Sequence, residues 1–246
     1  MAKRILILGG TSEALELASD LSGQKEFSVI YSLAGRVNHP RLPECEIRIG
    51  GFGGIDGLSS YLAEEHIQAV LDATHPFAAK ITRHIEQASR QLGLPLLSLV
   101  RPPWTALAED TWHEVPDLQE AVLTIPHLGK RVLLAVGRQE VSRFAQCTNE
   151  YFLIRSIEPP SAPLPPNCNI LLARGPFQLE DEIKLLRDHQ IDLIVSKNSG
   201  GAATYPKIQA ARELRIPVVM VQRPPASQAL SVATVSSALT WLHELD

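Results

Sequence analysis

A Gly-Gly-Thr-Ser-Glu segment near the start of the chain has the residue types and spacing of a phosphate-binding turn. It follows the apolar run Ile5–Leu8, which is typical of a strand buried on both faces of a parallel sheet. Glycines permit a sharp turn and a close approach to a ligand, and the N–H groups that begin a helix attract an anion. The third glycine of the G-x-G-x-x-G pattern is replaced by Ala14, so a turn without a ligand is the alternative. The predicted cofactor-binding residues here are Gly9, Gly10, Thr11, Ser12 and Glu13, with Ser12 or Thr11 as the helix cap.

The end of the second predicted strand, Ser28–Ser32, indicates which nucleotide would bind. In doubly wound folds an acidic residue at this place binds the ribose of NAD, and a basic residue accommodates the 2′-phosphate of NADP. Ser32, Gly35 and Arg36 stand here without an acid. We therefore predict NADPH as the cofactor, with NADH as the second choice. The alternative is that Arg36 is an ordinary exposed loop arginine.

Polar residues also follow the predicted buried strand Ala69–Ala73, at the edge where open α/β sheets bind ligands. His75 is either a proton donor to the ligand or a residue that holds the loop. The glycine-rich segment Gly50–Gly54 is either a ligand-contacting loop or a flexible linker. The predicted cofactor-binding residues after the strand are Thr74, His75, Pro76 and Phe77.

Four cations of the second half, Arg138, Arg174, Lys197 and Arg223, stand at or just after predicted strand ends. Such a group favours an anionic ligand such as a polycarboxylate, because guanidinium and ammonium groups pair with carboxylates. The alternative is that these cations form salt bridges and caps between the domains. The predicted substrate-binding residues are Arg138, Arg174, Lys197, Asn198, Ser199, Gly200 and Gly201.

These side chains require parallel strands that end at one edge of a sheet. Strand-like runs alternate with helical patterns along the chain, which predicts the α/β class with parallel sheets. QASRQLGLPLLSLVRPP at Gln87–Pro103 is similar to QAARELRIPVVMVQRPP at Gln209–Pro225, either by duplication or because two βαβ units share the same requirements. We predict two Rossmann-like domains, an NADP-binding one over 1–127 and a substrate-binding one over 128–246, with the active site in the cleft between them.

Three segments have weaker patterns. Residues 105–129 read as weak helical segments interrupted by prolines. A helix is expected at Glu140–Ala145, and Ala226–Leu245 is expected to form a packing helix.

Bulk composition excludes several classes of protein. A net charge of −4 over 246 residues argues against general nucleic-acid or membrane-surface binding. The chain has neither a transmembrane-length apolar run nor a signal peptide, so a cytoplasmic location is expected. Cys45, Cys147 and Cys168 are widely spaced and lack companion histidines, so we predict reduced thiols and no metal site. Monomer and small homo-oligomer both stay open.

A set of motifs resembles the precorrin-6A reductase family of cobalamin biosynthesis. They are ILILGGTSEALELA, GGFGG, DATHPFAAKIT, RPPW, RGPF and KNSGG, in this order over nearly the whole chain. The resemblance implies reduction of one double bond of precorrin-6A by NADPH, to give precorrin-6B. It implies two Rossmann-like domains with the ligands between them. Residues 9–13 and 32–36 match cofactor segments, Thr74–Phe77 would lie near the nicotinamide, and Lys197–Gly201 would face the tetrapyrrole.

The chemistry expected from the resemblance is hydride transfer from the nicotinamide to a conjugated ring system, followed by protonation. Lys197 and His75 are the candidate catalytic residues, with water as the alternative proton donor. No nucleophilic triad is evident in the sequence. Another NAD(P)-dependent reductase of an anionic small molecule, or a non-catalytic nucleotide-binding sensor, are the rival functions. Cobalt-free and cobalt-containing precorrin-6A are equally compatible with the sequence.

Overall fold

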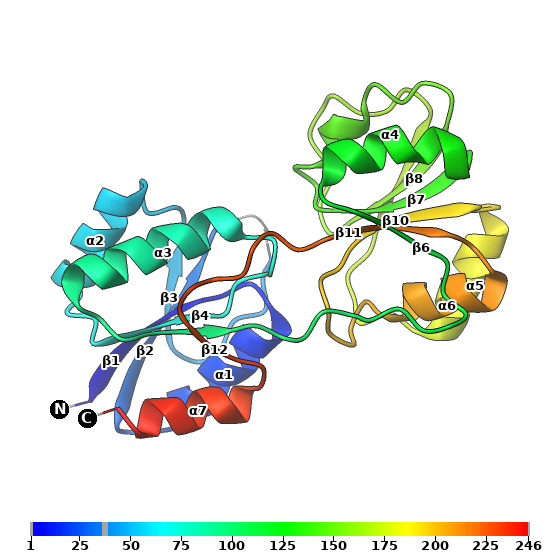
Figure 1. The fold of residues 1–246 in the computed structure, drawn as a ribbon. Helices are drawn as coiled ribbons and strands as arrows, with labels where there is room; N and C mark the ends of the chain where they lie inside the picture. The colour runs from blue at the N-terminus through cyan, green and yellow to red at the C-terminus, as the bar shows by residue number, and fades with distance from the viewer. Residues whose placement is uncertain (1, 36–38, 246) are drawn as a thin grey trace. The chain divides into compact units, whose positions relative to one another are not determined.

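The computed structural model describes residues 2–35 and 39–245. The chain divides into two compact units, which we name unit 1 (Met1–Pro102 with Pro224–Asp246) and unit 2 (Pro103–Arg223). Each unit holds a six-stranded parallel sheet with helices on both faces (Figure 1). Two parallel-sheet α/β units confirm the fold class predicted from the sequence. Within the described residues, no helix is long and apolar enough to cross a membrane.

Unit 1 has the strand order β12-β5-β4-β1-β2-β3, which is the order of dinucleotide-binding sheets. The chain runs outward from β1 in one direction through β2 and β3, and in the other through β4 and β5. Ligands bind at this reversal, beside the carboxyl ends of β1 and β4. The elements of unit 1 are β1 (Lys3–Leu8), α1 (Ser12–Ser22), β2 (Phe27–Leu33), β3 (Glu46–Ile49), α2 (Ile55–Glu64), β4 (Ala69–Asp72), α3 (Ala79–Leu92), β5 (Leu96–Leu99), β12 (Leu230–Val232) and α7 (Val235–His243).

Unit 2 repeats this order as β6-β11-β10-β7-β8-β9, so β7 and β10 correspond to β1 and β4. A short 3₁₀ helix, η1, stands where unit 1 has α1. The elements of unit 2 are β6 (Trp112–Val115), α4 (Leu118–Leu128), β7 (Arg131–Ala135), η1 (Val141–Phe144), β8 (Tyr151–Ser156), β9 (Cys168–Leu172), α5 (Leu179–Asp188), β10 (Leu193–Lys197), α6 (Pro206–Leu214) and β11 (Val218–Val221).

The two units exchange their sixth strands. After β5 of unit 1 the chain enters unit 2, where β6 pairs in parallel with β11. After β11 it returns to unit 1, where β12 pairs in parallel with β5. Each exchanged strand is followed by a helix, α4 in unit 2 and α7 in unit 1. The internal similarity in the sequence therefore corresponds to a repeated sheet topology.

This exchange differs from the division expected at residues 127 and 128. The chain passes from unit 1 to unit 2 between Pro102 and Pro103 and returns between Arg223 and Pro224, so unit 1 is built from two separate segments. The expected boundary was wrong because it assumed that each sheet uses one continuous stretch of chain. Strand pairing places β6 and α4 in unit 2, and β12 and α7 in unit 1.

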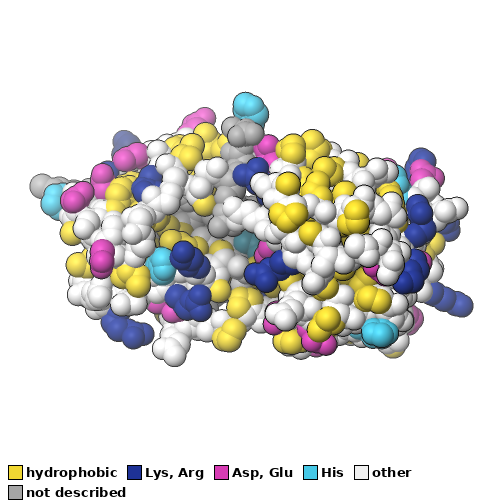
Figure 2. Space-filling view, turned by 90° about the horizontal axis from the view of Figure 1, so that it is seen from above, with side chains coloured by type: hydrophobic (Ala, Val, Ile, Leu, Met, Phe, Trp, Pro, Cys, Tyr) yellow, Lys and Arg dark blue, Asp and Glu magenta, His cyan; other side chains and the backbone are white. Residues whose placement is uncertain are grey.

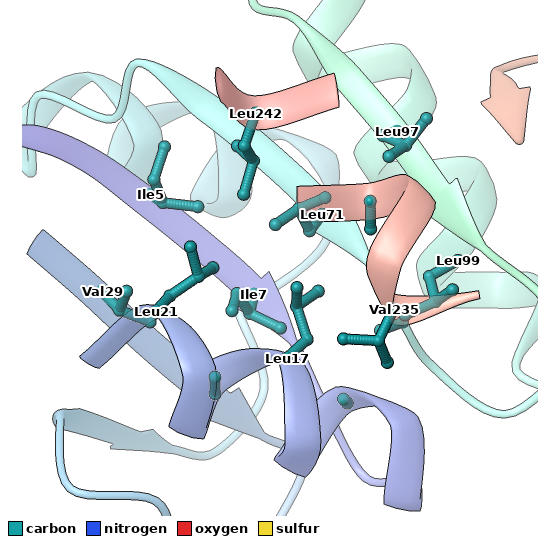
Figure 3. Close-up of a cluster of buried hydrophobic side chains, with 14 of the residues drawn as sticks. Ile5, Ile7, Leu17, Leu21, Val29, Leu71, Leu97, Leu99, Val235 and Leu242 are labelled. Carbon is teal, nitrogen blue, oxygen red and sulfur yellow. The ribbon is translucent and has the colours of Figure 1, made fainter. Parts of the chain in front are cut away.

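The apolar faces of the helices hold each sheet in place. In unit 1, α1 and α7 cover one face, where Leu17 and Val235 pack with Ile7 and Leu71 (Figure 3). The other face is covered by α2 and α3. Ile5–Leu8 is almost fully buried. This burial confirms the prediction of a strand buried on both faces of a parallel sheet, and it fixes the position of the turn that follows the strand.

Three local expectations are corrected. Residues 105–129 contain the strand β6 and the regular helix α4. The helix tolerates Pro126 because this proline falls in its last turn, where it removes only one helical hydrogen bond. The helix expected at Glu140–Ala145 is only the four-residue η1. The final segment contains β12 before its helix. In each case tertiary pairing or packing overrides the local pattern.

Candidate functional site

The turn after β1 can be formed only by glycine. Gly10 has a φ of +114°, in a region that other residues rarely adopt. At Gly9 a Cβ would lie 2.3 Å from Cζ of the buried Tyr31, so a side chain does not fit. The Gly10 N–H donates to the Tyr31 hydroxyl at 3.2 Å, and burial raises the pKa of that hydroxyl. The predicted sharp turn is therefore present, and the Tyr31 side chain of β2 holds it in place.

Thr11 caps α1 and ties the turn to β4. Its Oγ1 accepts from the N–H of Ala14 at 3.1 Å and donates to the carbonyl of Ala73 at 2.8 Å. Of the two caps considered from the sequence, Thr11 is the one used, and Ser12 is the first helical residue. The N–H groups of a first helical turn have no acceptor within the helix. A glycine turn that leads into an eleven-residue helix therefore fits a phosphate group well.

Glu13 lies in the first turn of α1 and is paired with Arg101. Nη1 of Arg101, which follows β5, is 2.8 Å from a carboxylate oxygen of Glu13. This pair borders a small hollow at the carboxyl ends of β1, β4 and β5. Arg101 neutralises a carboxylate that would otherwise repel a phosphate at the same helix end. The hollow is lined by Thr11, Glu13, Thr74, Pro76, Leu99, Val100 and Arg101.

The carboxyl end of β2 is held beside the glycine turn by a backbone hydrogen bond. Ser32 is buried, and its carbonyl accepts from the N–H of Gly9 at 2.9 Å. Gly35 has a φ of +71°. Arg36, the predicted 2′-phosphate ligand, lies outside the described residues. These positions keep the second strand end beside the glycine turn.

The glycine-rich loop that follows β3 is held by Arg48. The Arg48 guanidinium donates to the carbonyls of Gly50 and Gly51 and lies 3.6 Å from the ring centroid of Phe52. A Cβ at Gly57 would lie 1.9 Å from the Phe52 carbonyl oxygen. These contacts make the segment a braced loop beside α2, in contrast to the flexible linker considered from the sequence.

The loop after β4 presents Thr74 and His75. Oδ1 of the buried Asp72 accepts from both the backbone N–H and the hydroxyl of Thr74, at 3.1 and 2.7 Å. Nδ1 of His75 accepts from the N–H of Phe77 at 3.2 Å. An accepting Nδ1 carries no proton, so the proton of a neutral His75 ring sits on Nε2. His75 thus shapes the loop through Nδ1, and its ring proton lies on Nε2.

The corresponding turn of unit 2 holds a carboxylate from the chain itself. The Gly137 N–H donates to Oε2 of Glu140 at 2.8 Å. The ammonium of Lys197, at the end of β10, donates to both oxygens of Glu140, at 2.9 and 2.6 Å. Glu140 stands three residues after Gly137, as Glu13 stands three residues after Gly10. The predicted catalytic lysine is therefore one half of an ion pair.

The Lys197–Gly201 loop is attached to Trp104. The Asn198 amide oxygen accepts from the Trp104 N–H at 2.8 Å, and its amide nitrogen donates to the Trp104 carbonyl at 2.9 Å. The Trp104 indole N–H donates to the Gly201 carbonyl at 2.9 Å. Gly200 and Gly201 have φ angles of +66° and +78°. The loop precedes α6 by several residues, so it is not at the helix start expected from the sequence.

The other predicted cations are distributed around this loop to different extents. Arg138 directly follows Gly137, and Arg223 donates through Nε to the carbonyl of Asn198 at 2.8 Å. Arg174 is exposed and follows the edge strand β9. The loop that contains Arg174 contacts the segment after β10 through a hydrogen bond from the Phe177 N–H to the Ala203 carbonyl. On the face shown in Figure 2, acidic and basic side chains are interspersed, which agrees with the small net charge.

Unit 2 also contains charges that sequence reasoning did not identify. Arg155 and Glu182 form a buried ion pair. Lys207, at the start of α6, is 3% exposed and donates to the carbonyl of Thr204 at 2.8 Å. Burial, with the nearby Arg155 charge, lowers the pKa of Lys207 to about 7. Desolvation disfavours the ammonium form, which explains the direction of this shift.

Comparison with known proteins decides the family. The family model described as precorrin-6x reductase CbiJ/CobK matches residues 4–243. The chain belongs to the precorrin-6x reductase family. A precorrin-6A reductase of Rhodococcus erythropolis is 48% identical, and the match covers 98% of each chain. The oxidoreductase class and the family resemblance expected from the motifs are therefore confirmed.

Two further relatives place the chain within this family. A solved structure of CobK precorrin-6A reductase is 42% identical with a TM-score of 0.92, covering 98% of this chain and 96% of that chain. A cobalt-precorrin-6A reductase of Methanothermobacter thermautotrophicus is 28% identical, covering 89% of this chain and 76% of the relative. The chain is thus more similar to these reductases named for precorrin-6A than to the one named for cobalt-precorrin-6A.

Sequence reasoning missed Arg101, Glu140 and Trp104. Glu140 had a detectable signal, because its spacing from Gly137 repeats that of Glu13 from Gly10. Arg101 and Trp104 both lie within the RPPW motif, which carried part of the family resemblance but was given no structural or binding role. Their partners are distant in sequence, so no local pattern identifies these contacts.

Proposed function

We propose that the chain reduces precorrin-6A with NADPH, within cobalamin biosynthesis, and that unit 1 binds the nucleotide while unit 2 binds the tetrapyrrole. The observation that carries the assignment is the contrast between the two equivalent turns. The unit 1 turn leads into an eleven-residue helix, whereas the unit 2 turn leads into a four-residue 3₁₀ helix and holds Glu140. Only the first fits a cofactor phosphate.

The choice of NADPH over NADH rests on the end of β2. Ser32 and Gly35 stand there without an acidic residue among the described positions. An acid would favour the free ribose hydroxyls of NADH. Arg36 stays the predicted partner of the 2′-phosphate.

The choice of metal-free precorrin-6A rests on similarity. The Rhodococcus erythropolis relative named for the metal-free substrate is 48% identical, against 28% for the cobalt-precorrin-6A relative. Cobalt-precorrin-6A is therefore proposed as the poorer substrate. The expectation of an active site between the two units stays a prediction.

Residues at the strand ends supply binding and proton chemistry. When bound, the nicotinamide would supply the hydride. Thr74, His75, Pro76 and Phe77 would shape the nicotinamide side of unit 1, and His75 can donate through Nε2. In unit 2, Lys197 would pair with a substrate carboxylate or donate a proton to the reduced ring system. Arg138, Arg174 and Ser199 would contact further carboxylates.

The decisive experiment measures oxidation of NADPH together with the change in the tetrapyrrole spectrum. Purified protein is supplied with precorrin-6A or cobalt-precorrin-6A, each with NADPH or NADH. We expect the highest kcat/KM with precorrin-6A and NADPH. Turnover that is equal with both nucleotides would reject the cofactor assignment, and faster turnover of the cobalt form would reject the substrate assignment.

Arg36→Ala gives a matched test of the nucleotide site. We expect KM for NADPH to rise while KM for NADH stays unchanged, because only NADPH carries the 2′-phosphate. Arg41→Ala, a few residues further along the same loop, serves as the control for a general loss of positive charge. An equal loss for both nucleotides would show that Arg36 does not read the phosphate.

A further inference from the structure

We propose that Trp104 is a positioning residue of the substrate site, acting through Asn198 to fix the loop that carries Lys197. The inference rests on the proposed function, because it assigns a role to the loop expected to face the tetrapyrrole. The RPPW motif then has a purpose beyond ending β5. It delivers a tryptophan to the ligand-binding edge of the unit 2 sheet.

The side-chain amide of Asn198 is fully engaged by the Trp104 backbone. Its oxygen accepts from the Trp104 N–H and its nitrogen donates to the Trp104 carbonyl, at 2.8 and 2.9 Å. This reciprocal pair resembles a hydrogen-bonded pair of an antiparallel ladder, made by a side chain instead of a strand. An amide used in this way holds the loop, so the substrate contact predicted for Asn198 is replaced by a structural one.

The backbone of Asn198 is also fixed on both sides. Its N–H donates to the Val221 carbonyl at 2.9 Å, at the end of β11. Its carbonyl accepts from Nε of Arg223 at 2.8 Å. Trp104 lies where the chain enters unit 2 and Arg223 where it leaves. Asn198, which directly follows the predicted catalytic lysine, is thus hydrogen-bonded to the segment that enters unit 2 and to the segment that leaves it.

The indole ring extends this attachment across the loop. Its N–H donates to the Gly201 carbonyl at 2.9 Å. Together with the bonds to Asn198, this contact ties down both ends of the segment that contains the two left-handed glycines, Gly200 and Gly201. Beneath it, the Lys207 Nζ lies 4.5 Å from the ring centroid and Tyr205 packs at 5.7 Å between ring centroids. A flexible glycine pair is therefore bridged by a side chain whose own orientation is set by packing.

Lys197 is consequently fixed at two levels. Glu140 holds its ammonium, and the Trp104–Asn198 pair holds the backbone that follows it. Groups that bind a reacting substrate must be placed within a fraction of an ångström, so loosening this loop weakens substrate binding. The nucleotide turn of unit 1 shares none of these contacts.

The test compares Asn198→Ala, Trp104→Ala and Trp104→Phe with the control Trp112→Phe. Both Trp104 variants keep the two backbone bonds to Asn198 and lose the indole N–H bond to Gly201. Trp104→Phe keeps an aromatic ring packed beside Tyr205 and Lys207, whereas Trp104→Ala removes the ring as well. We expect the substrate KM to rise about tenfold for Asn198→Ala and Trp104→Ala, as for loss of roughly 1.4 kcal/mol. Trp104→Phe should recover most of this loss. NADPH affinity should be unchanged in every variant, and Trp112→Phe should match the parent.

Hydrogen exchange of the intact protein provides a readout that does not depend on turnover. Peptides covering residues 197–203 should exchange faster in Asn198→Ala and Trp104→Ala than in the parent or in Trp112→Phe. Unchanged exchange in both variants would overturn the inference. Faster exchange with unchanged KM would also overturn it, because the loop would then be fixed without serving substrate binding.

Lys197→Ala separates this inference from the proposed function. If Lys197→Ala leaves kcat and KM unchanged, the assignment of the substrate site to this loop fails, whatever the other variants do. If Lys197→Ala impairs turnover while Asn198→Ala changes neither KM nor exchange, the positioning role fails and the proposed function stands.

Discussion

The turns after β1 and β7 occupy equivalent places in two sheets of the same order, yet they treat charge in opposite ways. In unit 1 the glutamate of the turn pairs with Arg101 from the loop after β5. In unit 2 the equivalent Glu140 bonds back to the Gly137 N–H and to Lys197. The unit 2 turn holds an internal carboxylate, whereas the unit 1 turn is the one proposed to bind an external anion. In two sheets of the same order, the glutamate of the turn therefore pairs with a cation from a different strand end, β5 in unit 1 and β10 in unit 2.

The elements that follow the turns reinforce this difference. The α1 helix presents a full first turn of N–H groups, whereas η1 has only four residues. Unit 2 also buries long charged side chains, including Arg155, Glu182 and Lys207, while the buried polar residues described in unit 1 are Asp72 and serines. This contrast supports the proposal that unit 1 receives the phosphates of the nucleotide, because unit 2 carries buried charges of its own.

The largest expected effect concerns the stability of unit 2. The folded-state pKa of Lys207, about 7, lies below the value of about 10.4 for an unfolded lysine. Between these values the unfolded chain binds a proton that the folded chain has released. The free energy of unfolding should therefore rise with pH through this window, by up to about 1.4 kcal/mol per pH unit.

Urea unfolding at several pH values between 7 and 9.5 checks this prediction. Lys207→Met should remove the pH-dependent component, and Lys184→Met, at an exposed position, should keep it. Parallel pH profiles for Lys207→Met and the parent would show that the lysine does not titrate in this range.

Gly9→Ala is expected to damage unit 1 next most strongly. Its Cβ would meet the Tyr31 ring, so the turn must shift, at a cost of about 1–3 kcal/mol in stability. We expect NADPH affinity to fall by more than tenfold. Gly23→Ala, at the other end of α1 with nothing within 4 Å, is the matched control and should bind NADPH normally. Normal binding by Gly9→Ala would contradict the assignment of the phosphate to this turn.

Arg101→Ala probes the pair that keeps the unit 1 turn open. The uncompensated Glu13 carboxylate would repel a phosphate at the start of α1, and NADPH affinity should fall about tenfold, or about 1.4 kcal/mol. Glu13→Gln removes both the repulsion and the pair, so its loss should be smaller. Titration of NADPH fluorescence measures both. A larger loss in Glu13→Gln would mean that Glu13 itself binds the cofactor.

Glu140→Gln gives the smallest expected change. Loss of the carboxylate charge weakens its hold on Lys197, and the substrate KM should rise about threefold, while NADPH affinity is unchanged. Calorimetry should give one NADPH per chain for the parent and the variant. Two nucleotides bound per chain of the parent would contradict the proposal that only the unit 1 turn binds a nucleotide while Glu140 occupies the unit 2 turn.

Local patterns were sufficient for much of the fold and for the placement of the strand ends. Continuous apolar runs such as Ile5–Leu8 and the glycines that follow them are short-range signals, and both were identified correctly. The pairing of charges was not predictable. Arg101 reaches Glu13 across 88 residues, and Lys197 reaches Glu140 across 57.

The exchanged strands show a second limit of local reasoning. β6 and β12 have no feature that says which sheet they extend, because any short strand pairs with any open edge of suitable register. Only the completed topology assigns β6 to β11 and β12 to β5. The role of Asn198 was missed for a related reason, since its partner Trp104 is 94 residues away.

The exchange also sets the order in which the chain can finish folding on the ribosome. The first five strands of unit 1 are made early, but β12 and α7 come from the last residues of the chain. At about 5–20 residues per second, the edge of β5 waits on the order of ten seconds for its neighbour. Unit 2 is completed with α6 and β11 before unit 1 closes. Most of unit 1 therefore precedes unit 2 in synthesis, yet its sheet is completed after that of unit 2, and a product that lacks β12 would expose an open strand edge to chaperones and proteases.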